Sequence, residues 1–275
     1  MKFYKHIIPL LVIALFHFCS CKKKDTYPNT FVSGYWTVDL TATNKIPGDS
    51  IRKDHGYATI NLMSDSTLAY NIYVSPLGLG DVLTSAQLYS GTPAQNGTLL
   101  TELANIKFDT INQTISSMPV RKPVLDSLRS STAAMYLVVC SKQQPTGLLR
   151  GQVCVVGQKI GYAIDVSMAG NGVTPPVITT ATGSTVLRLM SDNTTLYYNV
   201  QVTGLNAGDV LTSAAVRKKS NGSAVLQLAS AASGFNTPLT TTITSATAAS
   251  LKTDSLYIDV RTAQYPNGLI AGKIR

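Results

Sequence analysis

The chain has 275 residues, is 44% hydrophobic and carries a formal net charge of +9 at pH 7. Its length allows two ordinary domains, each able to bury a core of its own. Charged residues make up only 13% of the chain and Glu102 is the only glutamate, which argues against long solvent-exposed helices and favours strands.

The first segment, residues 1–20, has the pattern of an export signal. Two lysines precede an apolar stretch from Ile7 to Phe18 that is short for a membrane span. The stretch leads into Ser20 and Cys21, and a small residue before a cysteine resembles a bacterial lipoprotein signal, although Phe18 stands where such signals usually have leucine. The resemblance implies cleavage after Ser20 and attachment of acyl chains such as palmitate to Cys21.

An acylated Cys21 would hold the protein on a membrane, with residues 21–34 as a tether. The lysine-rich run after Cys21 is typical of lipoproteins of the Bacteroidetes type. We therefore expect a bacterial cell-envelope protein, lipid-anchored in the outer membrane on its periplasmic or surface face. The alternative is an ordinary secretory peptide that is removed without lipidation. Because an exported protein meets little nucleic acid, none is expected as a partner despite the positive charge.

The rest of the chain contains an internal repeat. The seven residues Gly80–Ala86 recur without change as Gly208–Ala214, and flanking matches extend the two copies to residues 35–156 and 161–275. A copy of this length is a self-sufficient domain rather than one unit of a solenoid.

Within each copy the pattern is one of strands and turns. Apolar residues alternate with other residues from Leu68 to Val74 and again from Leu196 to Val202, which is typical of strands with one face in a core. A short helical turn is predicted at Val124–Arg129. The expected fold class is all-β, with two tandem immunoglobulin-like or Greek-key β-sandwich domains after the signal peptide.

Hairpin turns are predicted at two kinds of site. Asn96-Gly97 and Asn221-Gly222 are signals for tight turns in which both central residues have positive φ. Pro145–Gly147 and Pro266–Gly268 separate two strands near the end of each copy, where a further hairpin is expected.

The order of these features resembles the chordin-type domain (CHRD) family. The most specific segments close each copy, from Tyr136 to Val153 and from Tyr257 to Ile274. The resemblance implies an extracellular setting and an all-β fold, repeated twice over nearly the whole chain after the signal. It implies little about activity, and the histidines that the family often carries are absent: Cys140 and Arg261 occupy one such position.

Residues for catalysis are sparse. His55 is the only histidine after the signal segment and lies in a polar loop, so a Ser-His-Asp triad and a zinc site are not expected. The repeated aspartates Asp81 and Asp209 follow turn residues, where a carboxylate caps its own backbone. We therefore expect no enzyme, no metal and no cofactor.

Two cysteines of the first copy, Cys140 and Cys154, flank its last hairpin. An even pair in an exported protein suggests a disulfide, but their positions are offset relative to the turn, and the second copy has no cysteine at the matching sites. The sequence leaves this possible disulfide open.

The leading hypothesis is a non-catalytic binding or structural module whose membrane partner is reached through the N-terminal lipid. A basic cluster of Arg217, Lys218 and Lys219 occupies a connection that differs between the copies, and it is the candidate ligand loop. The partner would be an envelope protein or a glycan. The alternatives are a polysaccharide-active enzyme and a component of envelope assembly.

Overall fold

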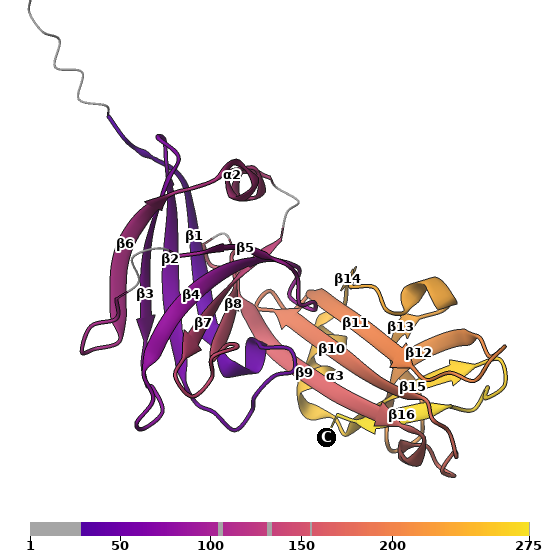
Figure 1. Cartoon of the computed structure of the whole chain (residues 1–275). Helices are drawn as coiled ribbons and strands as arrows, with labels where there is room; N and C mark the ends of the chain where they lie inside the picture. Colours follow the sequence, from indigo (N-terminus) through magenta and orange to yellow (C-terminus); the bar gives the residue numbers. More distant parts are fainter. Residues whose placement is uncertain (1–28, 104–106, 131–133, 155, 275) are drawn as a thin grey trace, which may run out of the picture. The chain divides into compact units, whose positions relative to one another are not determined.

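The computed structural model describes residues 29–103, 107–130, 134–154 and 156–274. Strands dominate the described part of the chain and form two curled eight-stranded sheets, one in each copy of the repeat (Figure 1). The signal segment 1–20 and Cys21 lie outside the described residues. No helix of the described residues is long and apolar enough to cross a membrane.

The first repeat is built from eight strands that share one sheet. They are β1 (Val32–Thr41), β2 (His55–Met63), β3 (Thr67–Val74), β4 (Leu83–Ser90), β5 (Leu99–Glu102), β6 (Gln113–Pro119), β7 (Met135–Ser141) and β8 (Leu149–Gln152). Their order across the sheet is β5-β4-β7-β8-β1-β2-β3-β6, and all neighbours are antiparallel. A short 3-10 helix, η2 (Ala42–Asn44), follows β1.

The second repeat has the same plan. Its strands are β9 (Ile160–Ala169), β10 (Thr182–Met190), β11 (Thr195–Thr203), β12 (Leu211–Lys218), β13 (Ala224–Ala229), β14 (Leu239–Thr242), β15 (Leu256–Thr262) and β16 (Ile270–Lys273), with 3-10 helices η3 (Gly170–Gly172) and η4 (Ala232–Gly234). The order β13-β12-β15-β16-β9-β10-β11-β14 is that of the first repeat, strand for strand. The predicted all-β class and the two tandem domains are confirmed.

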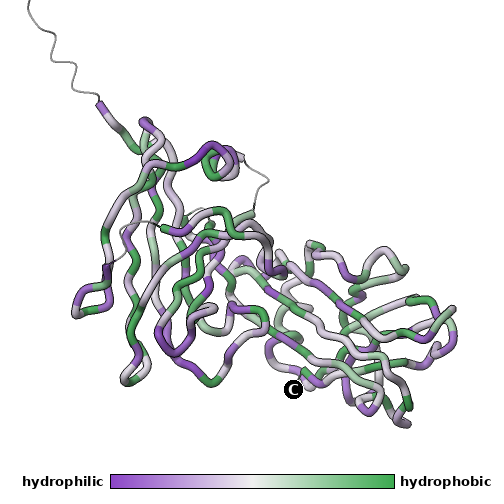
Figure 2. Tube along the Cα trace, in the orientation of Figure 1, coloured by the Kyte–Doolittle hydropathy of each residue, from purple (hydrophilic) through white to green (hydrophobic). Residues whose placement is uncertain are grey.

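Alternation along the strands builds the two cores. In β3 every second residue, from Leu68 to Val74, is buried, and these side chains join a cluster contributed by the whole first sheet. A matching cluster fills the second repeat. Apolar and polar positions alternate along the chain trace of both sheets (Figure 2), because successive side chains of a strand point to opposite faces.

Each repeat also carries one α-helix that packs on its core. The turn predicted at Val124–Arg129 is present as α2 (Lys122–Arg129), which buries Val124 and Leu128. Helix α3 (Ser245–Thr253) buries Ala248 and Leu251 and was not predicted. Thr244 caps it by accepting a hydrogen bond from the Thr247 amide at 3.1 Å, so a threonine-rich stretch that resembles a strand in composition begins a helix.

The turn predictions are corrected in part. Asn96-Gly97 and Asn221-Gly222 do lie in antiparallel connections, between β4 and β5 and between β12 and β13. However, neither residue of Asn96-Gly97 has positive φ, and of Asn221-Gly222 only Gly222 does, at 72°. These connections are therefore longer loops. The closing hairpins are confirmed, with positive φ at Gly147 and Gly268.

A buried ion-pair network fixes the loops at one end of the first repeat. The Asp81 carboxylate accepts hydrogen bonds from Arg52 at 2.9 Å, from the Ser141 hydroxyl at 2.8 Å and from the Gln143 amide at 3.0 Å. Arg52 also donates to Asp54 at 2.6 Å. Burial alone would raise the pKa of Asp81, but these hydrogen bonds outweigh it and hold the pKa below its usual value.

Replacing Asp81 tests this network. Asp81→Asn should lower the free energy of unfolding by about 1–3 kcal/mol, because charged hydrogen bonds to a buried group are lost. Asp209→Asn is the matched control: among the described residues Asp209 accepts only from the Val210 and Gln264 amides, so its loss should be smaller. Urea unfolding followed by circular dichroism measures both.

The effect of Asp81→Asn should depend on pH. A carboxyl whose pKa is depressed by folding contributes stability above its unfolded pKa of about 3.9 and loses it as the pH falls through the folded value. The difference between the wild type and the variant should therefore shrink below about pH 4. A difference that stays constant down to pH 2 would contradict the assignment.

Candidate functional site

The outer face of the first repeat carries a buried cation over an aromatic ring. Arg150 of β8 is only 2% exposed, and its guanidinium carbon lies 3.6 Å from the centre of the Tyr136 ring on β7. Tyr136 also stacks on Tyr89 of β4, with ring centres 5.2 Å apart and planes 7° from parallel. The aromatic face and its quadrupole therefore help to compensate the guanidinium for its lost hydration.

The β4–β5 connection, residues 91–98, covers this arginine and supplies its hydrogen-bond acceptors. Arg150 donates to the Thr92 and Gln95 carbonyls at 2.9 and 2.7 Å and to the Asn96 side-chain oxygen at 2.8 Å. Burial lowers the pKa of Arg150 to about 10, so the side chain stays charged near neutral pH. The connection and the arginine thus depend on each other.

The strand register identifies the corresponding residues of the second repeat. Arg150 pairs across the sheet with Val138, and Ala271 pairs in the same way with Asp259. Tyr257 takes the place of Tyr136, because each tyrosine begins the equivalent hairpin, two residues before Val138 or Asp259. The second repeat therefore keeps the aromatic ring but has a methyl group in place of the guanidinium.

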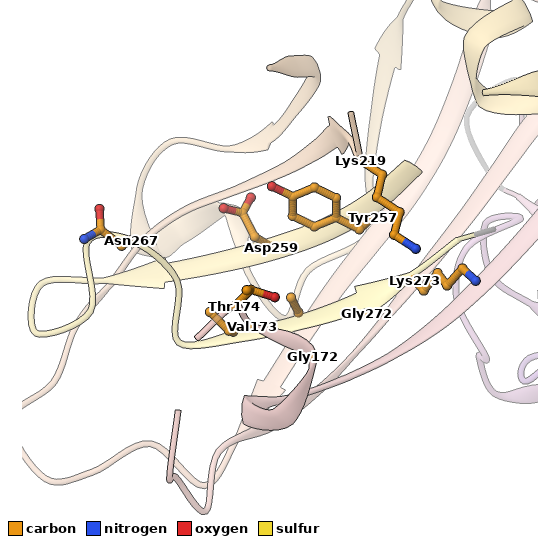
Figure 3. Close-up of a pocket in the computed structure, with 10 residues that line it drawn as sticks. Gly172, Val173, Thr174, Lys219, Tyr257, Asp259, Asn267, Gly272 and Lys273 are labelled. Carbon is orange, nitrogen blue, oxygen red and sulfur yellow. The ribbon is translucent and has the colours of Figure 1, made fainter. Parts of the chain in front are cut away.

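A pocket of about 520 Å³ occupies this place in the second repeat. Two differences account for it: the arginine side chain is missing, and the β12–β13 connection, residues 219–223, is shorter than residues 91–98. The pocket is lined by Gly172, Val173, Thr174, Lys219, Tyr257, Asp259, Asn267, Ala271, Gly272 and Lys273 (Figure 3). Its volume falls within the range of about 300–1,000 Å³ that is usual for small-molecule sites.

Asp259 is the carboxylate of the pocket wall, and it is already paired. Its two oxygens accept from Arg217 Nε and Arg261 Nε, both at 2.8 Å, and its side chain is 6% exposed. Arg217 donates further to the Gly222 carbonyl at 3.1 Å. The two arginines balance the buried negative charge, as burial requires, and leave Asp259 little capacity for another cation.

Two exposed lysines, Lys219 and Lys273, also line the pocket. Lys273 lies directly across the sheet from Tyr257, and Figure 3 shows both lysine side chains on the Tyr257 side of the pocket, away from Asn267. Among the described residues neither lysine has an ion-pair partner. The free charge that a ligand would meet is therefore positive.

The residues predicted as a ligand loop have separate roles. Arg217 is held by Asp259, and Lys218 lies 3.5 Å from an Asp254 oxygen. Only Lys219 lines the pocket. The sequence did not point to Ala271 or Tyr257 as site residues. The available signal was the charged Arg150 in an otherwise buried strand of one copy, matched by a small residue in the other.

The possible disulfide between Cys140 and Cys154 is absent, because both are free and buried. Cys140 pairs with Ser85 of β4, whereas Cys154 pairs with Thr37 of β1. Cys154 lies two residues beyond Gln152 on the continuation of β8, and Gln152 is opposite Tyr136 of β7. Cys140 lies four residues from Tyr136 in the other direction, so about six residues, or roughly 20 Å along the strands, separate the two cysteines. This is beyond the roughly 7 Å limit between Cα atoms of a disulfide. Burial raises the pKa of both thiols, to about 11 for Cys154.

The other residues considered for chemistry are not gathered into a site. His55 is exposed at the start of β2, and Asp81 and Asp209 bind loop backbone. Within the described ranges, no group of three or more histidine, cysteine, aspartate or glutamate side chains could hold a metal ion.

The fold and the pocket together define a tandem all-β module in which one copy has filled a site that the other leaves open. A family model, the CHRD domain, matches residues 36–153 and 164–274. The chain therefore belongs to the CHRD domain family, with two domains in tandem, as the sequence resemblance predicted. No curated protein and no solved structure matches the chain.

Removing the guanidinium from the first repeat should destabilise it. Arg150→Ala is expected to lower the free energy of unfolding by about 2–4 kcal/mol, because buried acceptors lose their donor. The only tryptophan, Trp36, packs on the first core, so its fluorescence reports unfolding of this repeat. Arg129→Ala, at an exposed position on α2, is the control, and equal losses for both variants would contradict the role given to Arg150.

Proposed function

We propose that this protein is a non-catalytic binding module of the bacterial cell envelope, anchored through a lipidated Cys21, and that its second CHRD domain carries the binding site. One observation supports the proposal most strongly. The site that Arg150 fills in the first repeat is an open pocket in the second, where Ala271 replaces the arginine.

The composition of the pocket suits binding. Ligand sites combine a hollow of sufficient size with an aromatic or apolar wall and a few polar groups that fix orientation. Tyr257 supplies the aromatic wall, and Thr174 and Asn267 supply side-chain hydrogen-bonding groups. The strands that carry Tyr257 and Ala271 are paired in a sheet, so these parts of the site are preorganised, which reduces the entropic cost of binding.

The same residues argue against a polysaccharide-active enzyme. Glycosidases of the common type use two carboxylates, one on either side of the scissile bond. Asp259 is the only carboxylate among the residues that line the pocket, and two arginines hold it as an ion pair. Both of its oxygens accept from an arginine Nε, so neither is free to reach a glycosidic oxygen or an attacking water. A binding role therefore explains the pocket better than hydrolysis does.

The anchor is tested by metabolic labelling of the producing bacterium with an alkyne analogue of palmitate. The full chain should incorporate the label and partition with membranes, and Cys21→Ser should abolish both, because the acylated thiol is lost. Cys19→Ser is the matched control and should remain labelled. Label that persists in Cys21→Ser, or that disappears only in Cys19→Ser, would contradict the assignment of Cys21.

The pocket is tested by giving the second repeat, at position 271, the arginine that the first repeat has at position 150. Ala271→Arg should fill the space beside Tyr257 and abolish binding to any saccharide that the wild type retains on a glycan array. Lys142→Ala, at an exposed site of the first repeat, should leave binding unchanged. Melting curves of each variant separate loss of the pocket from loss of the fold. A folded Ala271→Arg protein with undiminished binding would show that the ligand binds elsewhere.

A further inference from the structure

The charges around the pocket decide which ligands it favours. Lys219 and Lys273 contribute two positive charges that have no ion-pair partner among the described residues. The single negative charge, on Asp259, is matched by Arg217 and Arg261. The field in the pocket is therefore positive, and it attracts an anion and repels a cation.

By analogy with the first repeat, one candidate ligand for the pocket is a guanidinium group, such as an arginine side chain of a partner. Arg150, however, depends on the Thr92 and Gln95 carbonyls as acceptors, and the connection of residues 219–223 is three residues shorter than residues 91–98. A guanidinium in the pocket would therefore find fewer backbone acceptors than Arg150 does, and it would approach two lysines that have no ion-pair partner among the described residues. The second repeat therefore lacks part of the set of acceptors that holds the Arg150 guanidinium in the first repeat.

The shape of the pocket favours a ring over a flexible chain. In the first repeat the equivalent tyrosine carries a flat group 3.6 Å from its ring centre, so this face accepts a planar or ring-shaped group at van der Waals contact. The half-buried Tyr257 ring lies beside the lysines, and Thr174 and Asn267 face the same hollow (Figure 3). Hydroxyl and amide side chains of this kind match the hydroxyl groups of a sugar.

We infer that the pocket of the second CHRD domain binds an acidic saccharide, with its carboxylate at Lys219 and Lys273 and its sugar ring against Tyr257. This inference rests on the proposed function and adds the chemical class of the ligand. A hexuronic acid residue within an oligosaccharide has the required features: one carboxylate, one ring with C–H faces, and several hydroxyl groups. The first repeat, plugged by Arg150, takes no part in the binding.

Isothermal titration of the full protein in detergent tests the inference with three probes of matched length: trigalacturonate, neutral trigalactose and a triglutamate peptide. Trigalacturonate should bind, and the two others at least tenfold more weakly. Lys219→Ala and Lys273→Ala should each weaken trigalacturonate binding about three- to fivefold, and the double variant should lose it. Raising the salt concentration should weaken binding, since the lysines are exposed. Lys142→Ala is the matched control and should change nothing.

The possible outcomes separate this inference from the proposed function. Equal binding of trigalactose, with loss in Ala271→Arg, would overturn the acidic class and leave the binding role intact. Binding of triglutamate as strong as that of trigalacturonate would overturn the saccharide and leave a carboxylate site. Unchanged binding in the double lysine variant would remove the lysines from recognition. If none of the three probes binds, the inference fails, and the array with Ala271→Arg then decides the proposed function.

Discussion

The structure depends on one constraint: each strand of a curled sheet must present apolar side chains to the inside at every second position. Leu68, Tyr70, Ile72 and Val74 meet this condition in the first repeat, and Leu196, Tyr198, Val200 and Val202 meet it in the second. The inner face is thereby fixed, because a one-residue change of register would turn every outward side chain into the core. The outer face is not required to carry apolar side chains at every second position, and it is on this face that the two repeats differ.

On the outer face of the first repeat, the Arg150 side chain and the connection 91–98 stabilise each other. A buried guanidinium is tolerated only where acceptors and an aromatic face replace its hydration, and Arg150 obtains them from Tyr136 and the connection 91–98. In the second repeat the equivalent residue, Ala271, is uncharged and needs no hydrogen-bond acceptors. The residue that pairs with it is Asp259, whose buried charge is balanced by Arg217 and Arg261.

The strands, the repeat and the closing hairpins follow from local pattern, which is why the sequence was sufficient to predict them. The prediction of a tight turn at Asn96-Gly97 was wrong because tertiary contacts outweigh the local preference of this pair. Asn96 accepts a hydrogen bond from Arg150 and donates one to the Ile46 carbonyl. Arg217 looked like a free ligand residue because its partner, Asp259, is 42 positions away. Helix α3 was missed because the threonine-rich run just before it, residues 239–244, has the composition of a strand, and the Thr244 cap decides where the helix starts.

The separation of a fixed inner face from a variable outer one has a consequence for adaptation. Changes at position 271, at the neighbouring strand positions 257 and 259, and in the connection 219–223 alter what the pocket admits while the packed core stays as it is. Under the binding role proposed above, new ligand specificities would need only few substitutions and small insertions. The duplication adds to this freedom, because substitutions at the open pocket of the second repeat leave the contacts of Arg150 in the first repeat untouched.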